Sequence, residues 1–183
     1  FAIRRYEIGD VFVWEHEDQL KGTTRKERWR VTAASDHTAE FNGGAYIVTQ
    51  AGGLVKNAFG SHEPPIIEIV PDMAVGRRWR SAFVTTSRGQ RYRNFYESKV
   101  VALEAVELPL GRVKTFRVEH YGESVPADGR ATRLRRTTWI DVARGMVVRT
   151  DLEFSYAGAR PAEPEQPWSR FSRRLVAEER RLR

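Results

Sequence analysis

The sequence predicts a mainly antiparallel all-β protein, built as a curved meander sheet or half-barrel and followed by a C-terminal helix. Two observations predict the sheet: apolar and polar residues alternate along short segments, and turn-forming residues separate these segments. The alternation places one set of side chains on a buried face, because successive side chains of a strand point to opposite sides. A third observation, apolar residues at helical spacing after a Pro-rich stretch, predicts the helix.

Three segments show the alternation most clearly. In residues 146–156 apolar side chains occupy one parity and charged or polar side chains the other. Residues 27–33 alternate in the same way around Trp29, and residues 77–86 place Trp79 opposite the neighbouring arginines. Applied to the whole chain, the pattern predicts about eight to ten strands. They fall within residues 9–16, 27–34, 37–42, 45–50, 53–59, 66–70, 77–86, 91–108 with a break, 112–121, 132–140 and 146–156.

Residues that favour tight turns lie between these segments. Asn42–Gly44 and Asp128–Gly129 tolerate positive φ angles, and Ser87–Gly89 closes a further pair of strands. Pro109 presets φ for a turn that ends at Gly111. Because these turns join strands that are consecutive in sequence, they indicate a meander.

The chain is expected to divide into a sheet domain, residues 1–157, and a tail, residues 158–183. The tail begins with a linker that contains Pro161, Pro164 and Pro167 among small and acidic residues. Proline removes a backbone donor and fixes φ, so this stretch favours neither a strand ladder nor a helix.

After the linker, residues 168–182 have the pattern of a basic amphipathic helix. Trp168, Phe171, Leu175 and Leu182 recur at helical spacing, with Arg and Glu between them. We expect this helix to cover a face or an edge of the sheet. Anchoring to a partner or a membrane is the alternative.

The charge of the chain favours anionic partners. Its 31 basic and 24 acidic residues give a net charge of +7. The basic residues are spread along the chain, and no block of sequence holds them. An anionic surface is therefore a candidate partner, and binding of nucleic acid or another anionic polymer through a dispersed Arg surface is the alternative function.

Catalytic and metal-binding motifs are absent from the sequence. Without Cys it has no disulfide, thiolate zinc site or cysteine nucleophile, and it lacks GxSxG, HExxH, GxGxxG and phosphate-loop patterns. The histidines are scattered singly, at His16, His37, His62 and His120. We therefore predict no catalytic residue, no metal and no cofactor, and expect that the protein is not an enzyme.

The hydropathy of the sequence and its first residue both indicate where in the cell the protein is expected. No stretch approaches the roughly 18 consecutive apolar residues of a membrane-spanning helix, so we expect a soluble protein without a transmembrane segment. The chain begins at Phe1 rather than Met. We expect that an upstream segment was removed, either by trimming or as the signal peptide of an exported protein.

Aromatic residues occur on nearly every predicted strand. They can form the core, line a hollow that accepts a hydrophobic ligand, or stack nucleic-acid bases. Base stacking is the weakest of the three interpretations, because no RNA-binding motif accompanies the rings. The candidate residues for a ligand pocket are Trp14, Trp29, Trp79, Phe83, Phe116 and Trp139.

A resemblance to a known family enters between residues 76 and 154. A Trp-bearing strand at residues 76–83 precedes VVALEAVELPLG at 100–111, KTFRV at 114–118 and TWID at 138–141, with a Gly and Val-Arg in 145–149. This arrangement resembles the DUF3108-type cell-envelope domains, which are similar in architecture to the LolA/LolB lipoprotein-carrier superfamily of half-barrels. The motif residues build hairpins and specify no chemistry.

The resemblance implies a location in the periplasm or envelope of a bacterium, with association to the outer membrane included. We therefore expect a non-enzymatic binding or assembly module of the cell envelope. Its aromatic-lined concave face would hold a hydrophobic ligand or a segment of an envelope protein partner.

Overall fold

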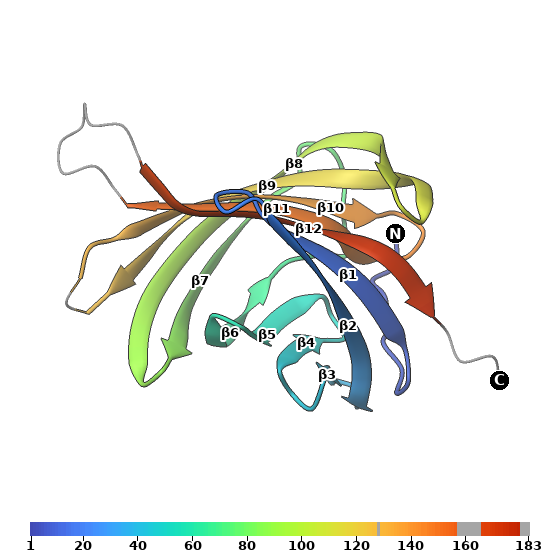
Figure 1. Ribbon diagram of the computed structural model, residues 1–183, viewed down its shortest axis with the longest axis horizontal. Helices are drawn as coiled ribbons and strands as arrows, with labels where there is room; N and C mark the ends of the chain where they lie inside the picture. The colour runs from blue at the N-terminus through green and yellow to red at the C-terminus, as the bar shows by residue number, and fades with distance from the viewer. Residues whose placement is uncertain (128, 157–165, 180–183) are drawn as a thin grey trace.

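The computed structural model describes residues 1–127, 129–156 and 166–179. Within these residues, twelve antiparallel strands form one closed barrel (Figure 1). Strands that are consecutive in sequence are neighbours, and β12 closes the barrel by pairing with both β11 and β1. The strands are β1 (Val11–Asp18), β2 (Thr23–Ala34), β3 (Thr38–Phe41), β4 (Tyr46–Thr49), β5 (Gly53–Asn57), β6 (Gly60–Ile67), β7 (Arg78–Ser87), β8 (Gln90–Leu108), β9 (Gly111–Pro126), β10 (Thr132–Asp141), β11 (Met146–Tyr156) and β12 (Gln166–Glu179).

The prediction of an all-β antiparallel fold is confirmed, but the half-barrel and the C-terminal helix are both wrong. The stretch from Trp168 to Glu179 belongs to β12, and the rest of the expected helix lies outside the described residues. The reason is Arg173, which occupies the inward parity between Phe171 and Leu175. A charged residue on the buried face masks the period of two and leaves apolar residues at apparent helical spacing.

Two other boundaries moved. The expected linker at residues 158–167 lies largely outside the described residues, and β12 begins at its end. The sixth strand was expected at residues 66–70 and instead covers Gly60–Ile67. It contains Pro64 and Pro65, residues that are rare inside strands. Its ladder with β7 stops at Glu63, before the two prolines, so their missing N–H groups do not interrupt that ladder.

The barrel has a long wall and a short wall. Strands β7 to β12 are each ten or more residues long, whereas β3, β4 and β5 have four or five. Figure 1 shows the short strands on the side opposite β8 to β12. The two walls meet at β6 and β7, where three residue pairs form the ladder. Farther along this seam the Trp79 indole N–H donates to the Ile67 carbonyl at 2.9 Å.

One end of the barrel, which we call the closed end, is covered by the N-terminal segment, residues 1–10. The Arg4 N–H donates to the Gly145 carbonyl at 2.9 Å, and the Gln50 side chain bonds both the N–H and the carbonyl of Tyr6. Gly145 has a φ of 63°, and a Cβ there would collide with the Ala2 backbone. Glycine is thus required where the segment crosses the β10–β11 turn.

Apolar side chains complete the closed end beneath this segment. The loop between β6 and β7 contributes Ile69, Val70 and Met73, which pack against side chains of the long wall, namely Val100, Phe116, Val118 and Ile140. All seven are at most 9% exposed. This end is therefore a dry core.

The opposite end, which we call the open end, carries the β1–β2, β5–β6 and β7–β8 turns and the beginning of β12. These turns and strand ends lie away from the N-terminus, which Figure 1 marks at the right. Eight strands already enclose enough space for a filled core, so a twelve-stranded barrel has interior volume to spare. None of the described residues forms a helix long and apolar enough to cross a membrane.

Candidate functional site

A cavity of about 680 Å³ occupies the barrel interior at the open end. A volume of this size falls within the range of roughly 300–1,000 Å³ that is common for small-molecule pockets. Its wall combines apolar, aromatic and charged side chains. Those that carry the argument below come from β2, β4, β5, β10, β11, β12, the β5–β6 turn and the β6–β7 loop: Trp29, Tyr46, Leu54, Phe59, Glu68, Arg136, Leu152, Phe171 and Arg173.

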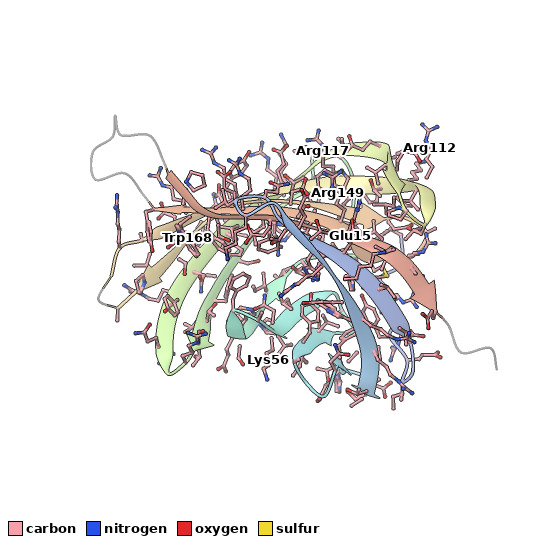
Figure 2. All side chains as sticks on the ribbon, viewed as in Figure 1. Glu15, Lys56, Arg112, Arg117, Arg149 and Trp168 are labelled. Atoms are coloured by element: carbon pink, nitrogen blue, oxygen red, sulfur yellow. The ribbon has the colours of Figure 1, made fainter. Side chains whose placement is uncertain are left out.

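Aromatic rings form a continuous series from the outside of the open end into the cavity. Trp168 is 45% exposed and stacks on Phe154, with 5.2 Å between ring centroids and 16° between planes. Phe154 meets Phe59 edge to face at 5.4 Å, and Phe59 stacks on Phe171 at 6.4 Å. Phe59 and Phe171 line the cavity, whereas Trp168 lies at the edge of the molecule, where Figure 2 labels it. We call these four residues the rim aromatics.

An ion pair lies inside the barrel beside the cavity. Arg136 projects inward from β10 and its Nη1 donates to Glu68 Oε1 at 2.6 Å. The two side chains are only 10% and 13% exposed, so the pair is largely removed from water. The Nε and Nη2 atoms of Arg136 are buried and have no hydrogen-bond partner. Two strong donors thus face the interior unsatisfied.

A second guanidinium projects inward from β12. The Arg173 guanidinium carbon lies 4.6 Å from the centre of a Trp14 ring and 4.9 Å from that of Trp29, with Tyr46 at 6.0 Å. Cation–π attraction holds a cation over such rings, most strongly over Trp. The Arg173 Nε is buried without a hydrogen-bond partner.

Burial and the two cations set the protonation of the neighbouring groups. Burial raises the pKa of Tyr46 to about 12, with Glu68 acting in the same direction and Arg173 against it. Burial and the charge of Arg173 lower the pKa of His16 to about 4, although Glu27 lies 3.1 Å from its Nε2. At neutral pH His16 and Tyr46 are therefore both uncharged.

The structure divides the aromatic residues proposed from the sequence. Trp14 and Trp29 pack together at 5.7 Å, and Trp29 borders the cavity. Phe83 is 5% exposed against Tyr96, and Phe116 lies in the closed-end core. Trp79 packs partly buried against that core while bridging the seam. The six residues therefore do not line one common pocket.

Trp139 lies on the opposite face of β10 from Arg136. Its ring sits beneath the guanidinium of Arg149 at 4.4 Å, and its indole N–H donates to Glu104 at 2.8 Å. Arg117 is its cross-strand neighbour on β9 and also contacts Glu104 at 3.3 Å. Figure 2 labels Arg117 and Arg149 on the side of the long wall.

Two histidines are buried in hydrogen-bonded groups of hydroxyls and amides. His120 bonds Ser98 at 2.8 Å through Nδ1 and Thr138 at 3.0 Å through Nε2. His62 bonds Thr85 at 3.0 Å. Burial lowers the pKa of both, that of His62 to about 4. His120 has no carboxylate to orient it and is 1% exposed, so this Ser–His contact is closed to a substrate.

The described part of the chain also has no cluster of metal ligands. Among the described residues, no three His, Asp or Glu side chains gather closely enough to hold an ion. The prediction that no metal is bound stays a prediction.

Sequence reasoning missed the charged residues of the cavity. Arg136 shares its parity with Leu134, Thr138 and Ile140 on β10, and this placement of an Arg on a buried parity was the available signal. Arg173 was assigned to the polar face of the expected helix. Glu68 lies in the loop after β6, and nothing local in the sequence relates it to Arg136.

Two solved structures have the same fold across nearly the whole chain. One is a proposed lipoprotein from Parabacteroides distasonis, with a TM-score of 0.59, 11% identity and coverage of 96% of this chain and 97% of that one. The other is the hypothetical lipoprotein YmcC from Escherichia coli, with a TM-score of 0.52, 10% identity and coverage of 92% of this chain and 84% of that one. At these identities the likeness concerns the fold alone.

No protein-family model matches the chain, and no curated protein matches it. The resemblance to DUF3108-type domains and to the LolA/LolB half-barrels therefore stays a prediction.

Proposed function

We propose that this protein is a non-enzymatic binding module of a bacterial cell envelope, and that the cavity at the open end of its barrel accepts a hydrophobic ligand or an apolar segment of a partner. The observation that carries the proposal is the cavity of about 680 Å³ and the rim aromatics that lead into it. Rings that remain half exposed at the mouth of the cavity stabilise a complex when a ligand removes them from water.

The shape of the cavity wall supports an apolar occupant. Leu54 and Leu152 are 3% and 7% exposed and line the cavity together with Phe59 and Phe171. Phe59 is 44% exposed, although it contacts two other rings. A ligand between these side chains would replace water against apolar surface on several sides at once.

The placement of the arginines supports this function over the binding of an anionic polymer. Many on the outer face pair with carboxylates of other strands: Arg80 with Glu97 on adjacent strands at 2.8 Å, and Arg28 of β2 with Glu179 of β12, across β1, at 2.7 Å. Cross-strand pairing neutralises the local field, whereas a nucleic-acid groove needs cations that are free to meet phosphates.

The envelope location is part of the proposal. It draws on the resemblance seen in the sequence and on the two neighbours of the same fold, both of which are named as lipoproteins. Fractionation of the source bacterium, with an antibody against this chain, tests it directly. We expect the protein in the envelope fraction, and a cytosolic distribution would contradict that part of the proposal.

Binding is tested with N-phenylnaphthylamine, a neutral apolar fluorophore. We expect a saturable rise of its fluorescence with the purified protein, and little change when salt is raised, because apolar contacts are not screened. Phe59→Asp places a charge at the cavity mouth and should abolish the signal.

The matched control is Phe95→Asp. Phe95 is 48% exposed, close to the 44% of Phe59, but it lies on β8 and does not line the cavity. This variant should bind the probe as the unmodified protein does. Equal losses in both variants, or no saturable binding at all, would refute the proposed cavity function.

A further inference from the structure

The charges inside the cavity identify the class of ligand more closely. Arg173 is the central observation, because it presents a cation to the cavity from the inward face of β12. The rings of Trp14, Trp29 and Tyr46 surround it within 6.0 Å. These rings hold the guanidinium in place but supply no full negative charge.

Arg173 lacks a carboxylate partner within the part of the chain that the structure describes. Among the described residues, none forms an ion pair with it, whereas its outward neighbours on β12, Arg170 and Arg174, pair with Glu153 and Glu15. A cation removed from water without a counter-charge is costly, and proteins seldom retain one without a use. The missing counter-charge is what an anionic ligand would bring.

Most of the other charged groups that face the cavity are engaged in ion pairs or turns, and the Glu17 carboxylate accepts the Ser172 hydroxyl at 3.3 Å. Glu68 accepts from Arg136, and Glu27 accepts from the indole of Trp29 at 3.1 Å and pairs with Arg25 at 2.8 Å. Asp18 accepts backbone N–H groups of its own turn. The Nε and Nη2 atoms of Arg136 have no partner but are fully buried, so Arg173 is the cation that remains for a ligand in the cavity.

The cation and the apolar surface are arranged in sequence along the cavity. Phe59 lies in the turn at the mouth, Phe171 lines the wall, and Arg173 follows two residues farther along β12, about 6–7 Å deeper. A ligand that satisfies both has a charged group at one end and an apolar body at the other.

We infer that the cavity binds an amphiphile with a single anionic headgroup, carboxylate or phosphate, which Arg173 holds while the apolar chain extends past Phe171 to the rim aromatics. Guanidinium groups suit both headgroups, because their paired donors match two oxygens of a carboxylate or phosphate. This inference rests on the proposed function and adds the ligand class to it.

The test compares ligands that share one chain length and differ in the headgroup: dodecanoate, dodecyl phosphate, dodecanol and dodecylamine, each displacing N-phenylnaphthylamine from the protein. At neutral pH we expect one or both anions to bind at least about tenfold more tightly than the alcohol, as hydrogen bonds to a charged group imply, and the amine to bind weakest. The two anions separate a carboxylate ligand from a phosphate ligand.

Arg173→Met should remove the preference for the anion and leave the binding of dodecanol in place, because Met keeps an apolar stem of similar length. Arg173→Lys should retain part of the preference. Arg174→Met is the matched control, since Arg174 is adjacent on β12 but pairs with Glu15 on the outer face, and it should bind every ligand as the unmodified protein does.

The outcomes separate the inference from the proposed function. If the alcohol and the anions bind the unmodified protein equally, the headgroup site is refuted and the apolar cavity stands. If the probe itself shows no saturable binding, the proposed function fails. If the probe binds but neither anion displaces it more readily than dodecanol does, only the headgroup site is refuted. The ligand series on the unmodified protein decides the question even if Arg173→Met does not fold.

Discussion

At the closed end of the barrel a pocket of only about 40 Å³ lies beneath the N-terminal segment, whereas the open end retains a cavity of about 680 Å³. Segments outside the strands fill the closed end. Tyr6 from the N-terminal segment packs edge to face on Phe12, and Ile69 and Met73 enter from the β6–β7 loop. The smaller space is comparable to one or two water molecules. The larger one has room for an organic molecule.

This difference suits two roles: the packed end of the twelve-stranded barrel stabilises the fold, and the open end leaves room for a ligand. Its strands alone enclose more interior than their side chains fill, so each end needs a further occupant. The closed end takes that occupant from its own sequence. Within the described residues nothing performs this role at the open end, where Phe59 and Trp168 stay about half exposed. Substitutions at the two ends test whether one end stabilises the barrel and the other binds a ligand.

The largest effect is expected from Phe12→Ala at the closed end. Phe12 is 1% exposed, packs on Tyr6 and lies beneath the guanidinium of Arg4 at 5.0 Å. Its truncation should lower the free energy of unfolding by about 3–5 kcal/mol, measured by urea denaturation. Phe171→Ala at the open end should cost only about 1–2 kcal/mol, because that ring already faces the cavity. Equal losses would contradict the division into a packed end and a binding end.

A somewhat smaller effect is expected from Glu68→Gln. Removing the charge leaves the buried Arg136 without its partner, and we expect a loss of about 3 kcal/mol, at the lower end for such pairs because the cavity admits water. The double variant Glu68→Gln with Arg136→Met should recover part of the loss, since no unpaired charge remains. A double variant less stable than either single one would show that the pair itself stabilises the barrel.

The two ends also differ in how far the sequence predicted them. Apolar alternation located most strands, because a half-buried sheet imposes a period of two on its own residues. β12 escaped because an inward Arg173 interrupts that period, and β6 because Pro64 and Pro65 are tolerated where its ladder with β7 has ended. Each exception is a departure from local rules that the pairing of the strands explains.

The cavity was predictable only in part for a similar reason. Trp29 was proposed from its strand, and it does border the cavity. Arg136 and Glu68 are separated by 68 positions, and Arg173 meets Trp14 and Trp29 only after the last strand closes on the first. Contacts between such distant positions follow from topology, which a single sequence expresses weakly.

A pH effect of intermediate size is expected from the neutral histidines. Burial lowers the folded-state pKa of His16 and His62 to about 4, below the ordinary 6.5, so the unfolded chain binds more protons between these values. Their contribution to stability is complete above pH 6.5 and is lost as the pH falls toward 4. The free energy of unfolding should fall by on the order of 2 kcal/mol between these pH values. This is less than the two pKa shifts alone would give, because His16 is partly open to water.

His62→Gln tests this assignment, because Gln can hydrogen-bond Thr85 but does not titrate. Chemical denaturation at a series of pH values should show a shallower decline for the variant than for the unmodified protein between pH 6.5 and 4. Parallel declines would mean that other groups cause the acid sensitivity.

The smallest effect is expected on the outer face, from Arg80→Ala. Arg80 is the cross-strand partner of Glu97, and the two side chains are 74% and 55% exposed. An ion pair in contact with water gains little, because the solvent screens it and both long side chains lose freedom. The free energy of unfolding should therefore change by no more than about 0.5 kcal/mol, and probe binding should not change. A large loss of binding in Arg80→Ala would locate the ligand on the outer surface, and the contrast between the two ends would then lose its functional meaning.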